Sequence, residues 1–239
     1  MVSNNQRKQI LKLKQKKYRQ NLGLFVAEGL KLVNELLSSG WSYKYLFTLN
    51  DHFHPKSKLI DLSSMKQITH FKNPSPILGV FEIPKLKPII QTQISIAVDG
   101  INDPGNLGTI IRLCDWFGIN DLVCSYHTVD NFNSKVLQAS MGSVVRVNCH
   151  YIKNLANYLG SLGKPIIGAD LSGKSIYEFN LPLKASYVFG SESQGLSESI
   201  KEIITEKLLI PNFRSGNSPE SLNVANATAI FLSEVFRRR

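Results

Sequence analysis

Residues 94–118 read ISIAVDGINDPGNLGTIIRLCDWFG: an apolar run, a polar turn and then a segment of helix length. The turn contains Asp103-Pro104-Gly105, residue types that favour turns, and Asn106 stands where the helix is expected to begin. The same alternation recurs at 121–140, where the apolar run DLVCS precedes the helix-like SKVLQAS. Strands that alternate with helices predict an α/β domain with a mostly parallel sheet and helices on both faces.

The region before this pattern predicts a separate, small α/β domain. A stretch with proline at both ends, 84–88, continues into polar residues up to Gln93 and is the best linker candidate. We therefore expect a first domain over 1–88, a linker at 89–93 and a second domain over 94–239.

The first domain should begin with a helix over 3–22. Ser3 and Gln6 have the spacing of a capping box, and no glycine or proline follows until Gly23. The other expected elements are an amphipathic helix at 25–40 and strands at 43–50 and 77–83.

The formal net charge of +10 lies entirely in residues 1–88, which hold 15 basic and 5 acidic side chains; the remainder has 13 of each. Several basic residues fall along one stripe of the expected first helix, with no acidic residue among them. Such a stripe binds a polyanion by counterion release, which favours nucleic acid. A solvated face and an acidic membrane surface stay open as alternatives. The candidate RNA-binding residues are Arg7, Lys8, Lys12, Lys16 and Arg19.

The composition excludes several classes of protein. Hydrophobic residues make up 43% and charged residues 19% of the chain, which argues against wholesale disorder. No apolar run approaches the roughly 18 residues that span a membrane, and the basic N-terminus lacks the apolar core of a secretory signal. Three cysteines without a CxxC pair suit a reducing compartment, so we expect a cytoplasmic location. No metal-ligand spacing surrounds His52 and His54, and no metal site is expected.

Three loops of the second domain each follow an expected strand and hold groups suited to ligand binding. The first spans 99–112. The second, FGSESQGL at 189–196, is neither a P-loop nor a nucleophile elbow, because no Gly-Lys-Ser/Thr follows and Glu192 stands in the serine position. The third leads to an apolar final helix, about 221–237, opened by Ser221 and Asn223. Ligands bind beyond the carboxyl ends of strands in open α/β sheets, so the three loops predict one site.

In this order the loops resemble the three motifs of the SpoU (TrmH) family of RNA 2′-O-ribose methyltransferases, in the SPOUT superfamily. The resemblance covers residues 94–239, and the opening segment looks like the small substrate-binding domain of many members. It implies a C-terminal trefoil knot, a homodimer with the active site near the subunit interface, and ribosomal or transfer RNA as substrate. The matching stretches are NLGTIIR at 106–112, FGSESQG at 189–195, IP at 210–211 and SLNV at 221–224, with KYR at 17–19 and FVAEG at 25–29 in the small domain.

The resemblance also implies a role for each motif. S-adenosylmethionine would be the methyl donor, held in the knot largely by backbone groups around Gly190, Ile210 and Leu222, and no metal would be required. The family gives its central role to the arginine that matches Arg112. Because a guanidinium stays protonated, we expect Arg112 to bind the phosphate beside the reacting ribose and to stabilise the forming alkoxide. The residues expected to fix Arg112 and the ribose are Asn106, Glu192, Ser221 and Asn223.

The sequence departs from the family pattern at 211–220, PNFRSGNSPE, which is a few residues longer than the usual loop. Arg214 within it is a candidate additional substrate contact. Two other functions are weighed: a non-catalytic RNA-binding or ribosome-assembly protein with the same fold, and a dehydrogenase-like nucleotide-binding domain. Retention of Asn106, Arg112, Glu192 and Asn223 disfavours the first, and the lack of G-x-G-x-x-G after the first strand disfavours the second.

Overall fold

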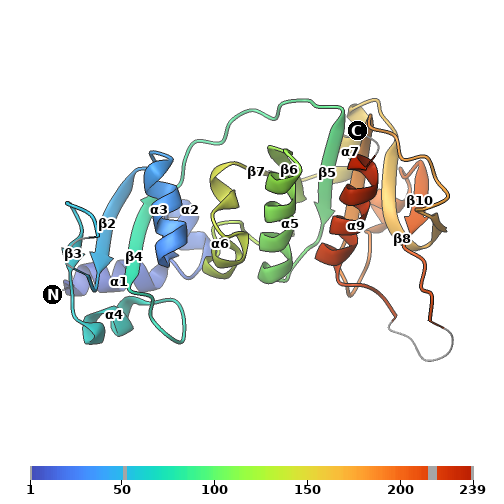
Figure 1. Ribbon diagram of the computed structural model, residues 1–239. Coiled ribbons are helices and arrows are strands. Elements are labelled where there is room, and N and C mark those ends of the chain that lie inside the picture. The colour runs from blue at the N-terminus through green and yellow to red at the C-terminus, as the bar shows by residue number, and fades with distance from the viewer. Residues whose placement is uncertain (1, 51–52, 215–219, 238–239) are drawn as a thin grey trace. The chain divides into compact units, whose positions relative to one another are not determined.

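The structure is a computed structural model that describes residues 2–50, 53–214 and 220–237. The chain forms two compact units, each with its own β-sheet (Figure 1). Unit 1 comprises Met1–Lys85 and Asp130–Val145, and unit 2 comprises Leu86–Val129 and Arg146–Arg239. The first boundary falls in the proline-bounded stretch that indicated a linker. The inclusion of Asp130–Val145 in unit 1 was not expected from the sequence.

Unit 1 is a four-stranded sheet in the order β1-β4-β2-β3, in which β1 and β2 run antiparallel to β4. Its strands are β1 (Leu24–Glu28), β2 (Tyr43–Thr48), β3 (Lys58–Leu59) and β4 (Ile77–Glu82). Its helices are α1 (Asn4–Lys12), α2 (Lys16–Leu22), α3 (Leu30–Ser38), α4 (Leu62–Ile68) and α6 (Ser134–Ser140), and a 3-10 turn, η1, covers Ser143–Val145.

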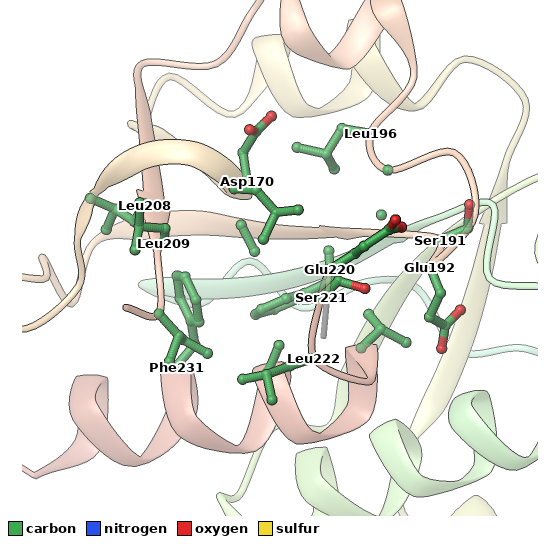
Figure 2. A pocket seen from close by; sticks show the side chains of 18 of the residues that line it. Asp170, Ser191, Glu192, Leu196, Leu208, Leu209, Glu220, Ser221, Leu222 and Phe231 are labelled. Carbon is green, nitrogen blue, oxygen red and sulfur yellow. The ribbon is translucent and has the colours of Figure 1, made fainter. Parts of the chain in front are cut away.

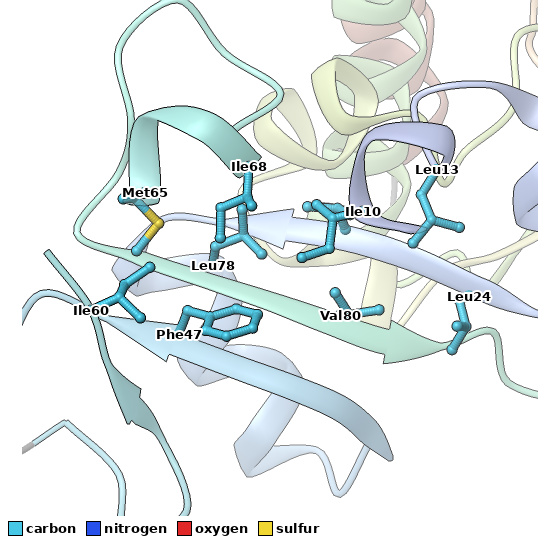
Figure 3. Close-up of a cluster of buried hydrophobic side chains, with 10 residues drawn as sticks. Ile10, Leu13, Leu24, Phe47, Ile60, Met65, Ile68, Leu78 and Val80 are labelled. Atoms are coloured by element: carbon cyan, nitrogen blue, oxygen red, sulfur yellow. The ribbon is translucent and has the colours of Figure 1, made fainter. Parts of the chain in front are cut away.

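Alternate side chains of β1 enter two different cores of unit 1. Leu24 and Val26 belong to a cluster with residues of α1 and α4 (Figure 3). Phe25 and Ala27 belong to a second cluster with residues of α3, and Leu137 of α6 lies in that cluster too. The sheet is therefore covered on both faces, and α6 is part of its core.

The helix expected over 3–22 was wrong as a single element. Its start is confirmed, because Ser3 and Gln6 form the capping box of α1. The chain then turns at residues 13–15 before α2 begins. The turn matters for the basic stripe, because side chains on either side of it no longer follow one helical spacing.

The helix expected over 25–40 was wrong in its first part, which is strand β1. Gly29, with a φ of 102°, separates β1 from α3. All five residues of β1 are buried. Burial on both faces of a sheet stabilises these apolar residues as a strand and outweighs their helix-like spacing.

Unit 2 is a six-stranded sheet in the order β10-β8-β9-β5-β6-β7, and neighbouring strands are parallel throughout. Its strands are β5 (Ile94–Asp99), β6 (Asp121–Ser125), β7 (Asn148–Ile152), β8 (Ile166–Ser175), β9 (Ala185–Gly190) and β10 (Glu206–Leu209). Its helices are α5 (Pro104–Trp116), α7 (Leu155–Ser161), α8 (Glu198–Lys201) and α9 (Val224–Phe236).

Helices cover both faces of this sheet, which confirms the expected α/β fold. Val188 of β9 packs in a cluster with residues of α7 and α8. The next residue, Phe189, makes an edge-to-face contact with Phe231 of α9, with ring centroids 5.4 Å apart. Helix α5 packs beside α9 (Figure 1). The trefoil knot stays a prediction. Within the described residues, no helix has both the length and the apolar character needed to cross a membrane.

Candidate active site

A cavity of about 570 Å³ opens beside the carboxyl ends of β9 and β10 and the middle of β8 (Figure 2). Its walls come from the loop at 190–196, from residues 208–213 and 220–222, and from one side of α9. Small-molecule sites commonly measure about 300–1,000 Å³. The cavity therefore has the size and position expected for a ligand site of an open α/β sheet.

The three residues expected to bind the cofactor, Gly190, Ile210 and Leu222, all line this cavity. Glu192 and Ser221, expected near the reacting ribose, line it too. These residues come from the second and third loops of the sequence. The structure thus brings two of the three predicted loops into the wall of one cavity.

Gly190 is required by the fold of its own loop. A Cβ at this position would lie 2.2 Å from the carbonyl carbon of Gly195. Ser191 and Gly195 exchange two backbone hydrogen bonds, and Gly195 has a φ of 66°. The loop therefore folds back over Gly190. The sequence had instead indicated that Gly190 and Gly195 allow a ligand to approach the backbone closely.

The first loop joins the other two through the side chain of Asn106. Its Nδ2 donates a hydrogen bond to Glu192 Oε1, and its Oδ1 accepts one of 2.8 Å from Asn223 Nδ2. The three predicted residues come from three separate loops. Their bonds fix the amide of Asn106 beside a carboxylate of the cavity wall.

Helix capping leaves these side chains available for the bonds between loops. Helix α5 begins at Pro104, two residues before the expected start, and its N-cap is Asp103, which accepts a hydrogen bond of 2.8 Å from Asn106 N. The N-cap of α9 is Asn223, whose Oδ1 accepts from the backbone of Ala225 and Asn226. Asn223 therefore caps α9 with its oxygen and binds Asn106 with its nitrogen.

Two carboxylates of the site were missed by the sequence interpretation. Asp99 ends β5, is 8% exposed, and accepts a hydrogen bond of 2.8 Å from Ser197 N, which ties the loop after β9 to β5. Asp170 lines the cavity. An acidic residue directly after an apolar run of the sequence was the available signal in both cases.

Asp170 is a charged group in a mainly apolar cavity wall. Burial raises the pKa of Asp170, but hydrogen bonds from Ser172 and the nearby Lys207 and Lys201 outweigh it and hold this pKa below its ordinary value. Lys201 also lines the cavity, and its Nζ is 2.7 Å from a carboxylate oxygen of Glu198. The cavity wall also includes Glu192 and Glu220, so carboxylates predominate among its charged groups.

Arg112 lies on α5 outside the cavity wall and outside the Glu192–Asn106–Asn223 bonds. It is exposed, and in the described ranges its guanidinium has neither a hydrogen-bond nor an ion-pair partner. A position six residues beyond Asn106 also falls on a different side of the helix. The structure therefore leaves Arg112 available for an anionic group from outside the chain.

The expected longer loop at 211–220 lies partly outside the described residues, which stop at Arg214 and resume at Glu220. Arg214 is exposed and does not line the cavity, whereas the preceding Phe213 lines it and is 85% exposed. Across the described part of the chain, no three His, Cys, Asp or Glu side chains group to hold a metal ion.

The basic residues of unit 1 divide into two groups. Arg7, Lys8 and Lys12 are exposed, and Lys16 is half-buried. Arg19 is only 3% exposed and forms an ion pair with Asp130. The expectation that Arg19 binds RNA was therefore wrong, because its guanidinium is fully engaged inside unit 1.

The chain thus combines a parallel α/β sheet that carries a ligand cavity with a second α/β unit that holds the excess of basic residues. Residues 93–233 match the model of the SpoU rRNA Methylase family, and residues 4–79 match that of the MRM3-like substrate binding domain. The first match covers more than half of the chain, so this protein belongs to the SpoU family of RNA methyltransferases.

Individual relatives agree with this assignment. The chain is 29% identical to the 23S rRNA (guanosine(2553)-2′-O)-methyltransferase RlmP of Bacillus subtilis, over 92% of each chain. It has a TM-score of 0.86 and 38% identity to a Porphyromonas gingivalis protein assigned to the TrmH family of RNA methyltransferases, over 100% of both chains. An AdoMet-bound rRNA methyltransferase from Sinorhizobium meliloti has a TM-score of 0.83 at 29% identity and covers 100% of this chain and 96% of its own.

Proposed function

We propose that this protein transfers a methyl group from S-adenosylmethionine to a ribose 2′-hydroxyl of ribosomal or transfer RNA. The observation that carries the proposal is the bonding of Asn106 to both Glu192 and Asn223, at the wall of a cavity lined by Gly190. The relative RlmP is named for 2′-O-methylation of 23S rRNA, and the S. meliloti relative is described as AdoMet-bound. Both names support this reaction.

The cavity suits S-adenosylmethionine in chemistry as well as in size. Its apolar walls, which include Leu209 and Phe231, fit an adenine ring. The carboxylate of Asp170 suits the positive charge of a sulfonium or an ammonium group. Gly190, Ile210 and Leu222 are the proposed holding residues. When bound, S-adenosylmethionine supplies an activated methyl group, and the protein has to place a hydroxyl in line with it.

Arg112 and the polar side chains of the three loops would bind and orient the RNA. Arg112, exposed and without a partner in the described ranges, would bind the phosphate beside the reacting ribose and stabilise negative charge as the hydroxyl loses its proton. A guanidinium stays protonated in proteins, so Arg112 is proposed to act as a charge and not as a base. Asn106, Glu192, Ser221 and Asn223 would orient the ribose. In-line positioning of this kind supplies several kcal/mol of a barrier.

The proposal extends to assembly and substrate binding. A homodimer is supported by Trp116, which ends α5 beside α9 and is 81% exposed. A knotted C-terminal segment is part of the proposal because the chain matches the SpoU family over residues 93–233. Residues 1–88 would bind the RNA through Arg7, Lys8, Lys12 and Lys16, and residues 94–239 would form the methyltransferase domain joined by the linker at 89–93. The buried free cysteines suit the cytoplasm.

Mapping 2′-O-methyl groups in total RNA from cells with and without this gene tests the proposal. We expect at least one ribosomal or transfer RNA position to lose its methyl group without the gene and to regain it when the gene is restored. Restoration by an Arg112→Ala variant would contradict the catalytic role of Arg112, and unchanged methylation in cells without the gene would favour a non-catalytic RNA-binding function.

A further inference from the structure

The turn between α1 and α2 presents a compact group of positive charge. We call Lys12, Lys14, Lys17 and Tyr18 the basic elbow. The three lysines are exposed and Tyr18 is half-buried. The Nζ atoms of Lys12 and Lys17 lie 5.5 Å and 5.2 Å from the centroid of the Tyr18 ring. Ammonium groups at this distance are attracted by the face of the ring. One lysine from each helix thus contacts the same tyrosine ring.

A buried arginine fixes the main chain of this turn. Arg19 Nη1 donates hydrogen bonds of 2.8 Å to the carbonyl oxygen of Leu13 and of 2.9 Å to that of Lys14. Its Nε and Nη2 donate to Asp130 Oδ2 at 2.8 Å and 2.5 Å. The carbonyls at the end of a helix have no partner within the helix. Arg19 supplies that partner and is itself held by Asp130.

His70 holds the last turn of α1, which leads into the elbow, from a second direction. Its Nε2 lies 2.8 Å from the carbonyl oxygen of Ile10, and its Nδ1 lies 2.8 Å from Ser134 Oγ. Nε2 therefore donates to the carbonyl, and Nδ1 accepts from the hydroxyl. Ser134 belongs to the same inserted segment, Asp130–Val145, as Asp130. The inserted segment thus anchors both side chains that hold the turn.

We propose that the basic elbow binds the phosphate backbone of the RNA substrate, and that Arg19 and Asp130 are positioning residues that preform it. This inference rests on the proposed function and adds Lys14 and Lys17 to its RNA contacts, with Lys12 common to both. The earlier candidate, Arg19, acts through the backbone of the turn. Because the main chain of the elbow is already ordered before RNA binds, less conformational entropy is lost on binding.

The surroundings of the elbow favour RNA over a membrane surface. An interfacial helix buries a broad apolar face in the lipid. Here Ile10 of α1 and Leu13 at its end are at most 1% exposed, inside the core of unit 1 (Figure 3). The basic elbow therefore presents lysine charges and the ring of Tyr18 to a partner, and no broad apolar face.

The first test measures binding of the full-length protein to a fluorescein-labelled RNA hairpin over a series of salt concentrations. Lys12→Gln with Lys17→Gln removes two phosphate contacts, so the slope of log K against log salt should decrease by about 1.4 to 1.8, with a loss of affinity of roughly tenfold or more. The matched control, Lys31→Gln with Lys44→Gln, removes two exposed lysines of the same unit, one of which also contacts a tyrosine ring. It should bind as the unaltered protein does.

The second test separates positioning from charge. Tyr18→Leu and Asp130→Asn leave every lysine in place. Each should weaken RNA binding. The salt slope of each should stay closer to that of the unaltered protein than to that of the double lysine variant. Circular dichroism and S-adenosylmethionine titration show whether each variant is folded. Equal RNA affinity of the elbow and control variants would overturn the inference. The inference would also be overturned if the elbow variants lost binding to phosphatidylserine vesicles while their RNA affinity stayed unchanged.

These outcomes are distinct from failure of the proposed function. If the elbow variants lose RNA binding and the unaltered protein transfers no methyl group, RNA binding by the elbow is supported and the proposed reaction is contradicted. If the unaltered protein methylates RNA and the elbow variants bind and react as it does, the proposed reaction is supported and RNA binding by the elbow is contradicted.

Discussion

Asn223 donates a hydrogen bond of 2.8 Å from its Nδ2 to Oδ1 of Asn106, a residue 117 positions earlier in the chain. The same Asn223 caps α9 with its Oδ1. Asn106 in turn donates a hydrogen bond to Glu192. One side chain therefore stabilises a helix and orients the proposed site, and the two roles use different atoms.

The two roles can be separated by replacing Asn223 with Asp or Ala. Asn223→Asp keeps an oxygen for the cap but loses the donor to Asn106, so the melting temperature should stay near that of the unaltered protein while methyl transfer falls at least tenfold. Asn223→Ala loses both functions and should also destabilise the protein by about 1 kcal/mol. Thermal unfolding and RNA methylation assays measure the two effects. Full activity of the Asp variant would refute the role of the donor.

Gly190→Ala tests the close backbone passage in the cavity wall. The new Cβ would lie 2.2 Å from a main-chain atom of Gly195, so the loop at 190–196 has to move. We expect weaker S-adenosylmethionine binding by calorimetry and lower stability. Gly160→Ala is the matched control: it lies in α7 with nothing within 4 Å of the added Cβ. It should bind normally and be stabilised by up to about 1 kcal/mol. Equal cofactor affinity of the two variants would contradict the assignment.

The buried His70 predicts a pH dependence of stability. Burial is the main cause that lowers the pKa of His70 to about 4 from an ordinary value of 6.5. The unfolded chain therefore binds a proton that the folded chain does not, and stability should fall as the pH falls from 6.5 towards 4, by at most about 3 kcal/mol.

Denaturant unfolding of the unaltered protein and of His70→Gln at several pH values measures this contribution as a difference. Burial raises the pKa of Glu28, which works in the opposite direction near its ordinary value of 4.5, but Glu28 is present in both proteins. The glutamine variant should lose less stability across the window. Parallel curves would show that His70 does not titrate as its burial implies.

Trp116 tests the proposed homodimer. Its side chain is 81% exposed at the end of α5. Trp116→Glu should convert dimers to monomers in sedimentation velocity, because a charge replaces apolar surface at the interface. Leu62→Glu places the same charge at a half-exposed leucine of unit 1 and should leave the dimer intact. A monomeric unaltered protein would contradict the homodimer directly.

The sequence predicted the capping box of Ser3, because helix-start residues act over a few positions. Gly190, Ile210 and Leu222, which the family resemblance marked for cofactor binding, line the cavity, and their binding of the cofactor stays a prediction. The bond between Asn106 and Asn223 joins residues far apart in the chain, and no local pattern encodes it.

The misjudged features depend on tertiary packing. Arg19 follows the spacing of a basic stripe, but Asp130 neutralises it from a distant segment. The residues of β1 have a helix-like pattern, but a sheet buries both of their faces. The segment Asp130–Val145 follows a strand of one unit and supplies core residues to the other. In each case burial against a distant partner decided the structure.

The most direct test of the account is transfer of a labelled methyl group from S-adenosylmethionine to unmodified ribosomal and transfer RNA by the purified protein, followed by nuclease digestion. We predict label in a dinucleotide that resists cleavage, as a 2′-O-methyl ribose does. Arg112→Ala should lower this transfer at least a hundredfold, as expected for loss of one transition-state charge contact, while cofactor binding is kept. Label on a base, or equal transfer by the Arg112→Ala variant, would contradict the account.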